Sequence, residues 1–155
     1  MKYKVICDTR EKNAWDFEIL ESCSGMDISC LKTGDYTLEG YESILCIERK
    51  ASTSEIAGNL GINKKRFDAE MERISHYPQA FLILEFSMSD LLDFPRNSGI
   101  PVKKWSSIKI NGKYLLKSLL EYQVKYGIKI LFCDDRDQAF EVCDSIFKRI
   151  KSLIK

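Results

Sequence analysis

The stretch Ser43-Ile44-Leu45-Cys46-Ile47-Glu48-Arg49-Lys50 begins as an apolar run and ends in three charged residues. A short, continuous apolar run of this kind predicts a largely buried β-strand, because both faces of a central strand lie against other elements. Side chains alternate along a strand, so Glu48 and Lys50 point to one face and Arg49 to the other. We therefore expect a carboxylate and an ammonium group to share a small site where a buried strand ends.

The segments on either side of this strand alternate between strand and helix patterns. Strands are predicted before it at 2–7, 26–32 and 36–38, the last two as a pair around the turn Thr33-Gly34-Asp35. After it, the spacing predicts helices at 52–60, 64–77, 88–92, 113–126 and 138–154, with strands at 80–86 and 128–133. Residues 95–109 form the one long irregular connection. This order favours an α/β fold with a partly parallel central sheet between helices.

Length and composition are those of one folded domain. The chain has 155 residues, 45% hydrophobic and 30% charged, which excludes a disordered, collagen-like or low-complexity protein. Without repeats or a Pro/Gly/Ser-rich linker, a single domain at 1–155 is expected. No apolar run is long enough to span a membrane and no signal-peptide pattern is present, so a cytoplasmic protein without membrane association is expected. The six cysteines form no CxxC motif and accompany one histidine, so we interpret them as reduced residues rather than zinc ligands.

Charge is distributed unevenly along the chain. Residues 1–100 carry 12 Lys and Arg against 17 Asp and Glu, whereas residues 101–155 carry 12 against 6. A positive stretch near an acidic cluster suits a polyanion held beside a cation site, although a solvated helix face explains the same lysines. Most of the basic excess lies at 103–129, where Glu121 is the only acidic residue. The lysines of this stretch are Lys103, Lys104, Lys109, Lys113, Lys117, Lys125 and Lys129.

Three acidic motifs precede the first predicted helix: Asp8-Thr9-Arg10-Glu11, Gly34-Asp35-Tyr36 and Glu48-Arg49-Lys50. The first and third are each expected far less than once by chance at this composition, so surface salt bridges at strand ends explain them poorly. The Asp35 and Glu48 carboxylates can hold a hard divalent cation such as Mg²⁺, which prefers oxygen ligands and keeps several waters. Phosphodiester hydrolysis needs such a metal to polarise the phosphate and activate water, while Lys50 orients the nucleophile or neutralises developing charge.

These motifs resemble the signature of the ERCC4-type (XPF/Mus81-like) nuclease domain, a branch of the restriction-endonuclease-like superfamily. The likeness continues through 65–74 and 80–85, which are similar to the family's basic helix and following buried strand, and it spans about residues 3–150. The resemblance implies a restriction-endonuclease-like α/β fold, in which a central mixed β-sheet is flanked by α-helices. It also implies Mg²⁺- or Mn²⁺-dependent cutting of branched or flapped DNA in recombination, repair or replication.

Carried over position by position, the resemblance assigns roles to the motif residues. Asp35 and Glu48 would be metal ligands and Lys50 the catalytic lysine, while Asp8 and Glu11 would complete the acidic catalytic pocket, Asp8 also as a metal ligand. Supporting or phosphate-binding roles fall to Arg10, Arg49 and Arg66, and the basic stretch is expected to contact DNA through Lys103, Lys104, Lys109 and Lys113.

The sequence departs from the family pattern at two places. The family usually has an aspartate four residues after the catalytic lysine, where this chain has Ser54 followed by Glu55. The tandem helix-hairpin-helix module that commonly follows the domain has no room before Lys155. A stand-alone domain, bacterial or phage-like and associated with the nucleoid, is therefore expected.

The last predicted helix carries an apolar stripe made of Phe140, Cys143, Ile146, Phe147, Ile150 and Ile154. Because members of the family pair through their nuclease domains, we expect a two-fold homodimer through this helix and part of 113–126, with completion of the monomer core as the alternative.

Two other functions compete with a structure-selective endonuclease. One is a catalytically weak or inactive DNA-binding or scaffold module of the same fold, and the other is a sequence-specific restriction-like endonuclease.

Overall fold

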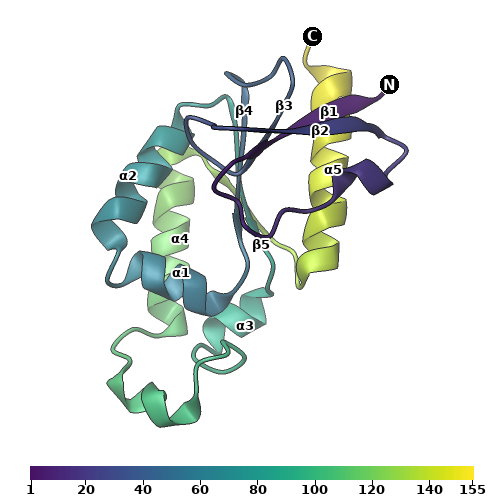
Figure 1. Ribbon diagram of the computed structural model, residues 1–155. Coiled ribbons are helices and arrows are strands. Elements are labelled where there is room, and N and C mark those ends of the chain that lie inside the picture. Colours follow the sequence, from purple (N-terminus) through teal and green to yellow (C-terminus); the bar gives the residue numbers. More distant parts are fainter.

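The computed structural model describes all 155 residues and contains one six-stranded sheet with helices on both faces (Figure 1). The strands are β1 (Tyr3–Asp8), β2 (Cys23–Ser29), β3 (Tyr36–Leu38), β4 (Leu45–Lys50), β5 (Gln79–Leu84) and β6 (Lys129–Phe132). The helices are α1 (Thr53–Leu60), α2 (Lys64–Ser75), α3 (Met88–Leu92), α4 (Gly112–Tyr126) and α5 (Arg136–Leu153), with two 3-10 helices, η1 (Phe17–Ile19) and η2 (Val102–Ser107). The predicted α/β class with a mixed central sheet is confirmed.

The strands lie in the order β2-β1-β3-β4-β5-β6. β1 is parallel to β2, β4 to β5 and β5 to β6, whereas the short β3 is antiparallel to both β1 and β4. The prediction that 26–32 pairs with 36–38 is wrong, because β1 lies between β2 and β3. The chain after β2 instead crosses the end of β1, where the N–H of Leu31 donates to the carboxylate of Asp8 at 2.8 Å.

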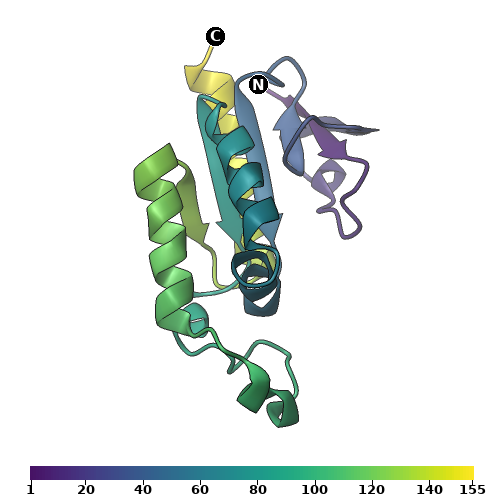
Figure 2. The same cartoon turned by 90° about the vertical axis from the view of Figure 1, so that its left-hand side faces the viewer.

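Two hydrophobic cores lie on opposite faces of the sheet. The helices α1, α2 and α4 cover one face, around Ile56, Phe67 and Leu115, while α5 and η1 cover the other, around Phe17 and Phe147. Figures 1 and 2 show α5 separated by the sheet from the other long helices. Every residue of β4 is buried, since its alternate side chains enter the two cores, and this explains its continuous apolar run.

The helices predicted from spacing are all present within a few residues, and their ends have local causes. Asn111 caps α4 by accepting the N–H of Tyr114, and Gly127 ends it with a φ of 67°. Asp135 caps α5 by accepting the N–H of Gln138, so this helix begins two residues earlier than predicted. The predicted irregular connection contains η2, and η1 was not predicted. None of the helices combines the length and hydropathy that crossing a bilayer requires.

Candidate active site

The turn before β3 places a carboxylate beside the charged end of β4. Gly34 has a φ of +83°, and a Cβ atom there would overlap the sulfur of Cys46, so this close turn requires glycine. The next residue, Asp35, is tied to the strands on both sides. Its N–H donates to the carbonyl of Ile47 at 2.8 Å and its carbonyl accepts the N–H of Asp8 at 2.8 Å. Its carboxylate accepts the N–H of Arg49 at 2.7 Å, which fixes the carboxylate at the end of β4.

Glu48 and Lys50 lie together on the face of β4 that α1 and α2 cover. The Lys50 Nζ donates to Oε1 of Glu48 at 2.9 Å, and each side chain is only 7% exposed. The ammonium also lies 5.2 Å from the ring centroid of Phe67 and 3.9 Å from Oε1 of Glu55, which follows on α1. Because each neighbour restricts the lysine, its charge is held against Glu48 rather than free in solvent.

A polar cavity of about 290 Å³ opens at this point. Lys50 does not line this cavity itself, but it bonds Glu48, which does. The lining residues come from the loop after β1, the turn before β3, the end of β4 and the start of α1, and only one of them is hydrophobic: Arg10, Glu11, Lys12, Asn13, Asp35, Glu48, Arg49, Ala51 and Glu55.

The Asp35 and Glu48 carboxyl groups have pKa values well above their ordinary range. Burial raises the pKa of Asp35 to about 7. The negative charges of Glu11 and Glu70 also raise this pKa, whereas the hydrogen bond from the N–H of Arg49 lowers it. Burial also raises the pKa of Glu48 well above its ordinary value, and the Asp35 charge raises it further. Burial works against the charged form of Lys50, but the Glu48 and Glu70 carboxylates outweigh it and raise the lysine pKa. The site holds more carboxylates than its lysine neutralises, which a bound cation would compensate.

These donors fit a hard divalent cation that keeps part of its water shell. One oxygen of Asp35 accepts the Arg49 N–H and one of Glu48 accepts Lys50 Nζ, so each carboxylate has a second oxygen that these two bonds do not use. No group of three or more His, Cys, Asp or Glu side chains converges to hold an ion alone. Mg²⁺ is commonly bound by one or two carboxylates, with waters and substrate phosphate completing its octahedron. Asp35 and Glu48 could therefore supply two of the ligands of such a cation.

Comparison with known proteins identifies the family. A sequence model described as the ERCC4 domain matches residues 7–146. This chain belongs to the ERCC4 family. The ERCC4 domain is also similar to the solved structure of XPF from Aeropyrum pernix, with a TM-score of 0.68 and 23% identity over 98% of this chain and 62% of that chain. For the complex of that XPF with DNA, the TM-score is 0.66 and the identity 22%, over 97% and 66% of the two chains.

The chain thus spans less than two thirds of the length of either XPF chain. At these identities the likeness shows a shared fold, and the ERCC4 match places that fold in a family of DNA nucleases. No curated protein matches the chain.

Of the remaining motif residues of this ERCC4 domain, Glu11 reaches the cavity and Asp8 does not. Asp8 is 2% exposed, and it accepts Nε of Arg10 at 2.7 Å, the backbone N–H of Arg10 at 3.0 Å and the N–H of Leu31 at 2.8 Å. Burial would raise the pKa of Asp8, but the hydrogen bonds from Arg10 and Leu31 outweigh it and lower the pKa. The carboxylate of Asp8 thereby ties two loops together beneath the site.

Arg49 is buried on the opposite face of β4, as side-chain alternation predicts. Its guanidinium pairs with Glu85 at 2.5 Å and with Glu11 at 3.2 Å, and its side chain is 5% exposed. It also lies 5.3 Å from the ring centroid of Trp15. Arg136 of α5 approaches Glu85 at 3.6 Å and completes the cluster. Arg49 therefore links the loop after β1 to the end of β5, where Arg136 of α5 also binds Glu85. Because these contacts bury its guanidinium, little of the side chain is accessible to DNA.

The other predicted DNA-binding residues lie on the surface. Arg66 is exposed on α2. The segment with η2 projects beyond α1 and α3, away from the body of the sheet (Figure 1), and none of the lysines of the basic stretch lines the acidic cavity. The four lysines of the basic stretch that are predicted to contact DNA are all exposed: Lys103, Lys104, Lys109 and Lys113.

Sequence reasoning did not single out Glu70 of α2, whose carboxyl group lies within hydrogen-bonding range of that of Glu48. Helical spacing could have found it, because Glu70 follows the buried Phe67 by three residues and precedes the buried Met71 by one. At the position of the family's aspartate, Ser54 bonds the neighbouring Ser52 hydroxyl, while Glu55 lines the cavity. Of these two, Glu55 is the residue that reaches the site.

Proposed function

We propose that residues 1–155 form one nuclease domain that cuts DNA with Mg²⁺ or Mn²⁺ and selects branched or flapped substrates. The observation that carries this proposal is the carboxylate pair of Asp35 and the buried Glu48, with Lys50 bonded to Glu48 at 2.9 Å. The A. pernix XPF bound to DNA, which has the same fold, supports DNA as the substrate. An intracellular, nucleoid-associated location goes with such a substrate.

Each residue then has a distinct task. Asp35 and Glu48 would hold the divalent cation, which when bound supplies a Lewis acid for the scissile phosphate and an activated water. Lys50 keeps a positive charge beside Glu48 and stabilises negative charge that develops on the phosphate. Arg49 orients Asp35 through its backbone N–H.

The surrounding acids have less direct roles. Glu11 and Glu55 stand on the cavity wall, where they can accept hydrogen bonds from waters that complete a cation's shell. Asp8 supports the cavity through Arg10 and Leu31, and we assign it this positioning role instead of direct coordination. Arg10 is exposed at the cavity rim, and the guanidinium N–H groups that do not bond Asp8 or Leu31 can bind a phosphate.

A panel of DNA substrates with different structures tests this function. Labelled single-stranded, duplex, flap, fork and four-way DNA would be incubated with Mg²⁺, Mn²⁺ or EDTA. We expect metal-dependent cutting whose position follows the branch point. Binding without cutting under every condition would favour the scaffold alternative, and cutting at fixed sequences regardless of structure would favour the restriction-like alternative.

DNA is proposed to contact the basic segment around η2. Neutralising Lys103 and Lys104 should weaken duplex binding similarly for all sequences and reduce the salt slope by roughly 0.9 per lost phosphate contact. A control variant, Lys2→Ala with Lys155→Ala, removes the same charge elsewhere. An unchanged slope in the Lys103 and Lys104 variant would assign these lysines to a solvated surface.

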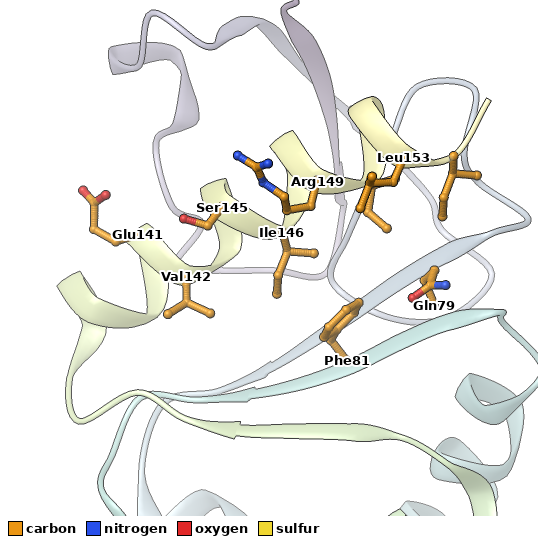
Figure 3. A pocket seen from close by; sticks show the side chains of 10 residues that line it. Gln79, Phe81, Glu141, Val142, Ser145, Ile146, Arg149 and Leu153 are labelled. Atoms are coloured by element: carbon orange, nitrogen blue, oxygen red, sulfur yellow. The ribbon is translucent and has the colours of Figure 1, made fainter.

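We also propose a two-fold homodimer, through part of the predicted helix stripe. Cys143, Phe147 and Ile150 are buried in the monomer core and are not available to a partner. The other side of α5 forms a groove of about 540 Å³ with β5, and Figure 3 shows Val142 and Ile146 pointing toward Phe81 across it.

The neighbouring surface is also incompletely covered. β6, which pairs with β5, is an edge strand. On the α5 side of the sheet Leu153 is 76% exposed, and on the α4 side Val124 is 87% exposed. A second copy would cover both the apolar groove and the free edge. Sedimentation equilibrium should give twice the 17.9 kDa chain mass, reduced by Leu153→Asp but not by Ile62→Asp, a control at a side chain 94% exposed elsewhere. A mass of one chain at all loadings would contradict the dimer.

A further inference from the structure

A second groove lies near the candidate active site, and the proposed hydrolysis does not use it. It has a volume of about 600 Å³ and lies between the end of α2 and the segment that follows β2. Ile6 of β1 and Thr37 of β3, which are cross-strand partners, form part of its floor. Their neighbours in both strands enter the core on the α5 side, so these two residues face the α2 side where that helix leaves the sheet uncovered.

The walls of this groove carry positive and aromatic side chains. Lys32 stands on one wall, and Arg73 and His76 stand on the α2 wall with Tyr77 next to them. Glu42 is the single acidic residue of the lining. Neither Lys32 nor Arg73 takes part in an ion pair within the chain. Two cations without acidic partners at a concave surface favour an anionic ligand.

On both walls, residues of the groove lie close in the chain to residues at the acidic cavity. Thr33 lines the groove, and Asp35 of the cavity follows two residues later. On α2, Glu70 approaches Glu48, and Arg73 lies three residues further, about 4.5 Å along the helix axis. A strand whose phosphate lies at Asp35 and Glu48 therefore meets the groove at an adjacent nucleotide.

We infer that this groove binds the unpaired DNA strand next to the scissile phosphodiester. A duplex keeps its bases inside, whereas an unpaired strand can place a base on an apolar floor, stack it on aromatic side chains and set its phosphates against cations. The inference rests on the proposed function for its position in the reaction. Binding of the strand is measured without cleavage, so the two can fail separately.

Cys30 provides a direct probe, because it lines the groove and is exposed while the other five cysteines are buried. In EDTA, saturating oligothymidylate of about eight nucleotides should slow alkylation of Cys30 by iodoacetamide about tenfold, and blunt duplex should slow it less than about twofold. Cys30→Ser identifies the alkylated thiol by mass. Equal protection by inorganic phosphate or thymidine monophosphate would contradict a strand site.

A charge variant gives an independent measurement. Lys32→Ala with Arg73→Ala should weaken oligothymidylate binding, followed by fluorescence anisotropy, about tenfold and lower the salt slope by roughly 1.4, or 0.7 for each lost contact on a single strand. The control pair Lys2→Ala with Lys155→Ala should leave both unchanged. DNA binding without protection of Cys30, or equal weakening by the control pair, would overturn the groove alone. Absence of any DNA binding would overturn both this inference and the proposed function.

Discussion

The end of β4, Glu48-Arg49-Lys50, carries charge clusters of different balance on its two faces. On one face, Arg49 and Arg136 meet Glu85 and Glu11, which also lines the acidic cavity, so positive and negative groups are equal in number. On the other face, the single Lys50 meets an excess of carboxylates, those of Asp35, Glu48, Glu55 and Glu70. Buried charges of equal number satisfy one another and fix structure, whereas an excess of one sign needs a ligand of the other. The difference indicates which face is built for chemistry.

The largest expected effect is on the carboxylate-rich face. Glu48→Gln or Asp35→Asn should lower the cleavage rate by several orders of magnitude and leave DNA affinity nearly intact, because binding depends on phosphate contacts elsewhere. Single-turnover rates and anisotropy on the same flap substrate measure the two quantities. A variant that cleaves at close to the wild-type rate would remove its carboxylate from the metal site.

Lys50→Ala should lower cleavage by roughly 10²- to 10⁴-fold, the range of a group that supports proton transfer or charge development. Its unfolding free energy should change less than that of an Arg49 variant, because Glu48, with its raised pKa, can take up a proton when its partner is lost. A loss of rate below about threefold at saturating metal would limit Lys50 to a structural role.

The balanced face is expected to control stability. Arg49→Ala leaves Glu11 without its cationic partner and the buried Glu85 with Arg136 alone, so it should lower the free energy of unfolding by about 3 kcal/mol. Urea denaturation measures this loss, with Arg66→Ala, at an exposed arginine of α2, as the control. If both variants unfolded at the wild-type midpoint, the charge cluster around Arg49 would not stabilise the fold.

The smallest expected effect is the pH dependence that Asp35 gives to stability. Its pKa rises from 3.8 to about 7 on folding, so the folded state retains a proton that the unfolded state has lost, and stability falls as pH rises from about 4 to about 7. Without metal, Asp35→Asn should be more stable than wild type at pH 8 by on the order of 2 kcal/mol, less than the full shift because water reaches the cavity. Mg²⁺ should raise the thermal midpoint of wild type and not of the variant, and a parallel rise in both would place the bound ion elsewhere.

The sequence predicted those features that depend on local periodicity. The buried strand β4, the opposite directions of Glu48 and Arg49 and the positions of the main helices all follow from side-chain alternation or helical spacing. The pairing of β2 with β3 was wrongly predicted, because the place of β1 between them depends on a long connection and on the hydrogen bonds of Asp8 with Arg10 and Leu31. Glu70 lies far from the other acids in sequence, and its approach to Glu48 depends on how α2 rests on the sheet.

Cation binding itself tests the contrast between the two faces of β4 most directly. Free Mn²⁺ would be followed by electron paramagnetic resonance during titration of the protein, in the presence of DNA under conditions too cold for cleavage. Glu48→Gln is compared with Glu72→Gln, which changes an exposed glutamate on the solvent side of α2. We predict that wild type and Glu72→Gln bind Mn²⁺ alike and that Glu48→Gln binds at least about tenfold more weakly. Equal Mn²⁺ affinity in all three proteins would contradict the assignment of the carboxylate-rich face as the metal site.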